Sequence, residues 1–168
     1  DKIRSLRNGV FWLSETPDQQ ASKSWDSENL NIAVWSVFRY GRYEFVLLNT
    51  QFDEKSDTAQ YNSARLLWKQ VRTMTEGQAI VMGTLNANQN SKAVKYLFGE
   101  EKPEETDEAS TEEDTEDDLN EEPKEVHPNF INIFKHAKVM LGSNAKDTQH
   151  NYKGIRSTSN TGIIDWIF

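Results

Sequence analysis

The fold is decided by residues 32–48, which read IAVWSVFRYGRYEFVLL. In the first nine of these residues, apolar side chains occur at both odd and even positions, so both faces of an extended chain are apolar there. This pattern favours a strand covered on both sides over one that is half exposed to solvent. Gly41-Arg42 leaves only two residues before the second apolar run, which predicts a tight hairpin.

A strand and a helix are expected on either side of the hairpin. Residues 9–14 form a short apolar run that predicts a strand. Asp57, with Gln60 three residues later, resembles the capping box of a helix. That helix has apolar residues at 3/4 spacing and cations on its solvent side. The apolar set is Tyr61, Ala64, Trp68 and Val71, and the cations are Arg65, Lys69 and Arg72.

Later in the chain, residues 79–82 predict a buried strand and Ser91 caps a short helix. Helical spacing over 130–137 and a final apolar run over 162–168 predict one more helix and one more strand. This mixture of strands and helices indicates an α+β fold. The 168 residues suffice for one domain and are too few for two of ordinary size.

The composition excludes several classes of protein. With no Cys, the chain has no disulfide framework, no thiolate zinc site and no Cys nucleophile. The three His residues show no ligand spacing, so they predict no metal site. No apolar run is long enough to span a bilayer, and the first residues lack the apolar core of a signal peptide. We therefore expect an intracellular protein.

Charge is distributed unevenly along the chain. Residues 100–125 contain fifteen acidic residues and two lysines, a local charge of −13 against −8 for the whole chain, so the remainder carries +5. Such a segment is expected to be a solvated, disordered insert. The alternative is a docking strip for a basic partner, tuned by phosphorylation at Ser110, Thr111 or Thr115.

Polar residues follow three of the expected buried strands, where α/β folds commonly bind ligands. These segments are 49–53 (NTQFD), 83–88 (GTLNAN) and 164–166 (IDW). They are the places where a catalytic or binding site is expected.

Five segments in this order resemble the endonuclease/exonuclease/phosphatase superfamily, and the resemblance covers nearly the whole chain except the acidic insert. They are 11–17 (FWLSETP), 22–26 (SKSWD), 48–50 (LNT), 63–67 (SARLL) and 164–168 (IDWIF). The resemblance implies a two-layer β-sandwich flanked by helices, a four-layer α/β/β/α fold that is incomplete in this chain. It also implies Mg²⁺-assisted hydrolysis of phosphate esters at the strand ends.

Two positions depart from the motifs of that family. Members usually have Asn-Thr-His where this chain has Asn-Thr-Gln51, and Gly-Asp-Phe-Asn where it has Gly-Thr84-Leu-Asn86. The resemblance implies that the His contacts the phosphate and that the Asp activates water. Gln cannot carry a proton at neutral pH, and a Thr hydroxyl is far too weak a base. Asn86 is retained.

The last matched motif retains Asp165, which the resemblance implies orients a His in a following Ser-Asp-His. The motif's Arg is Ile163 here, and the chain stops at Phe168. His150 and Tyr152 lie in a segment that resembles the one lining the family's substrate cleft, and a surface role for His150 is equally open.

No metal ligands are predicted. Asp53 and Glu54 closely follow Gln51, so a weak metal site is conceivable at these two carboxylates. Ordinary surface charge is the favoured interpretation of both.

Three functions follow from these observations. The favoured one is a catalytically inactive member of the superfamily, a structural or binding module with protein partners in a larger assembly and no cofactor. The alternative is an active Mg²⁺-dependent nuclease or phosphatase whose missing groups lie outside this chain. The third is a phosphate- or nucleic-acid-binding module that uses the +5 remainder of the chain and cations such as Arg65.

Overall fold

The computed structural model describes residues 2–76, 78–100, 128–131 and 165–167. The acidic insert beyond Glu100, the helix predicted over 130–137, His150 and Tyr152 lie outside these residues, apart from the first positions of that helix. The elements are β1 (Arg4–Trp12), β2 (Ile32–Tyr40), β3 (Tyr43–Gln51), α1 (Asp57–Met74), β4 (Gln78–Thr84), α2 (Lys92–Leu97) and β5 (Asp165–Ile167). No helix in this part of the chain has the length and apolar character needed to cross a membrane.

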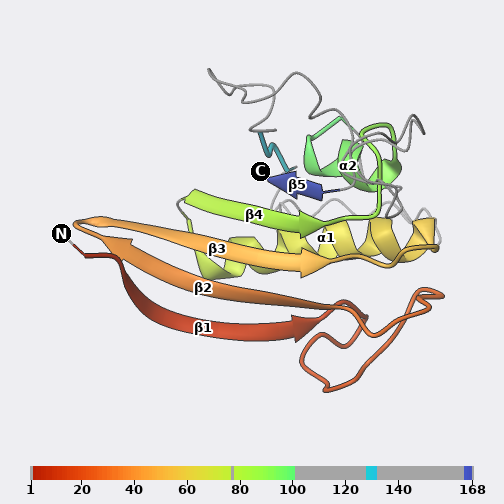
Figure 1. The fold of residues 1–168 in the computed structure, drawn as a ribbon, viewed down its shortest axis with the longest axis horizontal. Coiled ribbons are helices and arrows are strands. Elements are labelled where there is room, and N and C mark those ends of the chain that lie inside the picture. Colours follow the sequence, from red (N-terminus) through yellow and green to blue (C-terminus); the bar gives the residue numbers. More distant parts are fainter. Residues whose placement is uncertain (1, 77, 101–127, 132–164, 168) are drawn as a thin grey trace, which may run out of the picture.

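The strands form one five-stranded sheet in the order β1-β2-β3-β4-β5 (Figure 1). β1, β2 and β3 pair antiparallel, and Gly41 takes a positive φ of 59° in the tight β2–β3 turn. β3 and β4 pair in parallel, so α1 forms the crossover between them, and β5 pairs antiparallel with β4. The predicted order of elements is confirmed for the described residues.

The hydrophobic core lies between one face of the sheet and the helices. Figure 1 shows α1 running along that face, and α1 and α2 contact each other. Alternate residues of the strands point into this core, as the period of two predicts. They are Ala33 and Val37 of β2, Val46 and Leu48 of β3, and Val81 of β4. Ala64, Leu67 and Val71 of α1 meet them.

The opposite face of the sheet is not covered by described residues. Val10 is 54% exposed, and its cross-strand partner Val34 is 51% exposed. The prediction that strand 32–40 is covered on both sides is therefore wrong for this part of the chain, because both helices pack on the Ala33 face. The α+β class is confirmed, and the described residues supply one sheet layer and one helical layer of the four expected.

The starts of the helices follow local hydrogen bonding. The prediction that Asp57 and Gln60 form a capping box is wrong. The N-cap is Ser56, one residue before Asp57, and its side chain accepts a hydrogen bond of 3.1 Å from the Ala59 amide. The other predicted cap is confirmed, since Ser91 accepts from the Val94 amide at 3.3 Å.

Leu67 is fully buried where α1 packs on the sheet, so we expect Leu67→Ala to lower the free energy of unfolding by about 2–5 kcal/mol through reduced burial and the remaining cavity. Urea unfolding followed by tryptophan fluorescence measures this. Lys69→Ala, at an exposed position of the same helix, is the control and should cost less than about 0.5 kcal/mol. Equal costs for the two variants would contradict this packing.

Candidate active site

The register of the sheet brings three of the sequence-predicted positions side by side. Gln51 at the end of β3 pairs with Thr84 at the end of β4, and Thr84 pairs with Asp165 at the start of β5. Adjacent strands lie about 4.8 Å apart, so these three backbone positions form a short line across the sheet. We call Gln51, Thr84 and Asp165 the strand-end row.

The row lies where the parallel strands β3 and β4 end, the edge at which α/β sheets commonly bind ligands. Loop 13–31 lies at the same end of the molecule (Figure 1). The side chain of Gln51 is exposed and that of Thr84 is partly buried, while Asp165 is placed by its backbone alone. The Gln51 carbonyl accepts a 3.1 Å hydrogen bond from the side-chain amide of Asn31, which fastens the loop to the row.

Gly83, next to Thr84, is required by the close approach of β3 and β4. Its φ is +145°, and a Cβ at this position would lie 1.9 Å from the carbonyl oxygen of Thr50. A side chain therefore cannot be placed here without separating the two strands that carry Gln51 and Thr84.

Asn86, which the sequence resemblance matches to a family motif, joins the ends of the two strands. Its Nδ2 donates to the carbonyl of Phe52 at 2.8 Å, and its own carbonyl accepts from Nε2 of Gln60 at 3.2 Å. The backbone of Asn86 has a φ of +51°, a conformation that Asn tolerates better than most residues. The side-chain amide of Asn86 thus holds the loop after β3 in place.

Asp53 is the centre of the hydrogen bonding behind the row. Its side chain is only 2% exposed. One oxygen accepts from the Ser27 hydroxyl at 2.9 Å and from the amides of Glu28 and Asn29 at 2.7 and 3.2 Å. The other oxygen accepts from the amides of Lys55 and Ser56, both at 2.9 Å. The carboxylate therefore joins loop 13–31 to the start of α1.

Burial by itself would raise the pKa of Asp53. The hydrogen bonds from the Ser56, Lys55 and Asn29 amides and from the Ser27 hydroxyl outweigh it and hold the pKa well below its usual range. The expectation that Asp53 is ordinary surface charge is wrong, and its two oxygens are already occupied by five donors, so it is a poor metal ligand. Glu54 is exposed, as expected.

Gln60, only 3% exposed, extends this network to β4. Its Nε2 donates to the carbonyl of Asp53 at 2.8 Å and to that of Asn86. Gln60 was predicted only as a capping residue. Asp53 was included in the expected site segment 49–53, but its role in joining loop 13–31 to α1 was not predicted. The signal for Asp53 was its position three residues before Ser56, the N-cap of α1, because an Asp side chain there commonly accepts from the amides that follow it.

A Mg²⁺ ion, which the resemblance implies, needs several oxygen ligands, usually with a carboxylate among them. Within the described residues, no three His, Asp or Glu side chains lie close enough together to hold a metal. Both carboxylate oxygens of Asp53 already accept hydrogen bonds, and in the strand-end row Asp165 is the one acidic residue. The described residues alone therefore do not fit a Mg²⁺ site.

Because Asp53 is a buried anion held by five donors, Asp53→Asn should lower the free energy of unfolding by at least about 2 kcal/mol at pH 7. The folded-state pKa is lowered, so the carboxylate stabilises fully above the unfolded pKa of about 3.9 and progressively less as the pH falls below it. The difference between the two proteins in urea unfolding should shrink on acidification. Asp57→Asn, at an exposed carboxylate, is the control, and an equal effect there would contradict the assignment.

Gly83→Ala tests the close approach of β3 and β4. We expect a loss of at least about 2 kcal/mol in the free energy of unfolding, because the added methyl meets the Thr50 carbonyl in a backbone conformation that Ala disfavours. Gly41→Asn is the control at a positive φ in an exposed turn and should cost far less. A stability for Gly83→Ala like that of the unmodified protein would exclude this geometry.

No protein-family model and no curated protein matches the sequence significantly. Solved structures do match it. An endonuclease/exonuclease/phosphatase from Bacteroides vulgatus is 29% identical, with a TM-score of 0.55, over 57% of this chain and 38% of its own. A family protein from Bacteroides thetaiotaomicron is 31% identical, with a TM-score of 0.52, over 56% of this chain and 35% of its own.

A mannosyl-6-phosphatase from Bacteroides thetaiotaomicron is also 31% identical, with a TM-score of 0.52, over 56% of this chain and 37% of its own. The chain thus spans less than two fifths of the length of these structures. Over the part that is matched, it has the fold of the endonuclease/exonuclease/phosphatase family, and the resemblance seen in its motifs is confirmed.

Proposed function

We propose that this chain is part of an endonuclease/exonuclease/phosphatase-like protein that does not hydrolyse phosphate esters and acts as a structural or binding module. The observation that carries the proposal is the strand-end row, in which Gln51 and Thr84 are neighbours. They stand where the family motifs have a His and a water-activating Asp. General-base catalysis typically contributes about 10²- to 10⁴-fold, and neither side chain can supply it.

The contacts of Asp53 argue against its acting as a substitute for the missing general base. It lies two residues after Gln51, but its oxygens accept from loop 13–31 and from the start of α1. Its lowered pKa also makes it a weaker proton acceptor than an ordinary carboxylate. The groups around the row are used to hold the strand ends together.

In this proposal the chain is a portion of one domain over residues 1–168, and the acidic segment 100–125 is a contact element for a basic protein partner in a larger assembly. His150 and Tyr152 would line the ligand cleft of that domain. No cofactor is required for such a role.

The alternative is an active Mg²⁺-dependent phosphoesterase whose missing groups lie outside the described residues. The presence of Asn86 and Asp165 at strand ends that meet in the sheet favours it. Because one structure of similar fold is a mannosyl-6-phosphatase, phosphate monoesters are the first substrates to assay for this alternative.

The test is hydrolysis of a generic phosphate monoester and a generic diester by the full-length protein with Mg²⁺ or Mn²⁺. We expect no rate above that of buffer with metal, because the row lacks a general base. Metal-dependent hydrolysis that Asn86→Ala removes, in a protein whose circular dichroism shows it still folded, would refute the proposal and support the alternative. Asn90→Ala, at an exposed amide in the same loop, is the control and should leave any such activity unchanged.

A further inference from the structure

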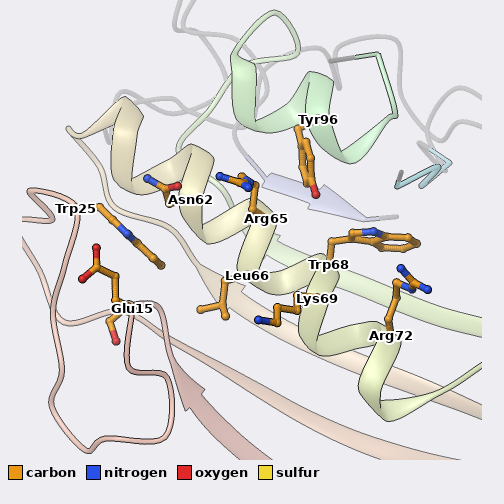
Figure 2. Close-up of a pocket in the computed structure, with 10 residues that line it drawn as sticks. Glu15, Trp25, Asn62, Arg65, Leu66, Trp68, Lys69, Arg72 and Tyr96 are labelled. Atoms are coloured by element: carbon orange, nitrogen blue, oxygen red, sulfur yellow. The ribbon is translucent and has the colours of Figure 1, made fainter. Parts of the chain in front are cut away.

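A groove crosses the outer side of α1, away from the sheet, with a volume of about 450 Å³. Loop 13–31 lines it from one side with Trp25, and α2 lines it from the other with Tyr96 (Figure 2). The helix itself forms the floor. The sheet-facing residues of α1 are Ala64, Leu67 and Val71, so this α1 groove is separate from the strand-end row.

Three cations line the floor of the groove: Arg65, Lys69 and Arg72. Their spacing of four and three residues places them along one side of the helix over about 10 Å. Within the described residues no ion pair joins any of them to a carboxylate. Glu15 also lines the groove, and the three cations outnumber it. Like charges at this spacing repel one another, so the groove is suited to an extended anion.

Aromatic rings accompany these cations. Trp68 is held edge-on against Phe130, with ring centroids 5.4 Å apart, and Tyr96 against Tyr61 at 5.8 Å. These contacts orient rings that also line the groove. The groove therefore combines cations with flat apolar surfaces whose orientation is already fixed.

Trp25 reaches the groove from a strained backbone. Its φ is +60° and that of Asp26 is +58°, a left-handed conformation that bulky residues rarely adopt. The Trp25 carbonyl accepts a 3.1 Å hydrogen bond from Ser56, the cap of α1, which ties the strained segment to the helix. Strain of this kind persists where the surrounding structure enforces it and is common at ligand sites.

We propose that the α1 groove binds a short single strand of nucleic acid. Its phosphates lie along Arg65, Lys69 and Arg72, and a base stacks on the ring of Trp25. Single-strand-binding proteins combine these two elements, a cationic track for the backbone and rings for the bases. An acidic peptide would use the cations and leave the rings without flat partners, whereas a duplex keeps its bases stacked inside and unavailable to them.

The test is the fluorescence anisotropy of a labelled ten-nucleotide oligothymidine with the full-length protein at several salt concentrations. We expect Arg65→Gln/Lys69→Gln/Arg72→Gln to weaken binding at least ten-fold at low salt. It should also reduce the slope of log K against log salt by about 2, because each neutralised phosphate contributes about 0.7 to that slope. The control Lys2→Gln/Arg4→Gln/Arg42→Gln removes the same charge at exposed positions elsewhere and should change neither affinity nor slope by as much.

Base stacking is tested separately with Trp25→Leu, which keeps the charge of the groove. We expect about a ten-fold weaker affinity for the oligonucleotide and an unchanged affinity for inorganic polyphosphate. Circular dichroism establishes that each variant is folded. Absence of oligonucleotide binding at low salt overturns the proposal, as does an equal decrease in affinity for the two charge variants. So does an affinity for the oligonucleotide that Trp25→Leu leaves unaffected, which would make the groove a general polyanion or acidic-peptide site.

Discussion

Five hydrogen-bond donors converge on the buried carboxylate of Asp53, and the arrangement of the strand ends depends on them. A carboxylate out of water is costly unless its lone pairs are filled, and here they are filled mostly by backbone amides. Those amides belong to loop 13–31 and to the start of α1, which are also joined by the hydrogen bond from Ser56 to the Trp25 carbonyl and by the Lys55–Glu28 ion pair. Through Gln60 the same hydrogen bonding reaches Asn86 and the end of β4.

In this chain the residues that hold the strand ends in place are different from the three residues of the strand-end row. Asp53, Gln60 and Asn86 hold the ends of β3 and β4, and Gly83 lets the two strands approach closely. The strand-end row lies at the strand ends that these residues hold in place. A scaffold of this kind is as suitable for holding a ligand as for cleaving one, because both require strand ends fixed to within fractions of an ångström.

Signals that act over a few residues predicted most of the fold, including the hairpin, the helix after it and the strand expected over 79–82, which the structure extends to 78–84. The exposure of Val34 was not predicted, because the face that is covered depends on helices elsewhere in the chain. The site was harder for the same reason. Gln51 and Thr84 came from a resemblance, and the pairing that makes them neighbours is a long-range property of the sheet. Asp53 was assigned wrongly because three of its donors, at residues 27–29, lie about 25 residues earlier in the chain.

β5 has a consequence for the order of folding. It is three residues long and pairs with β4 across about 80 intervening residues, whereas β1, β2 and β3 are joined by connections of about 20 residues or fewer. Closing so long a loop costs more chain entropy, and three residues return few contacts for it. The hairpin and crossover are therefore expected to form first, so that nascent chains hold Gln51 and Thr84 in place before Asp165 joins them.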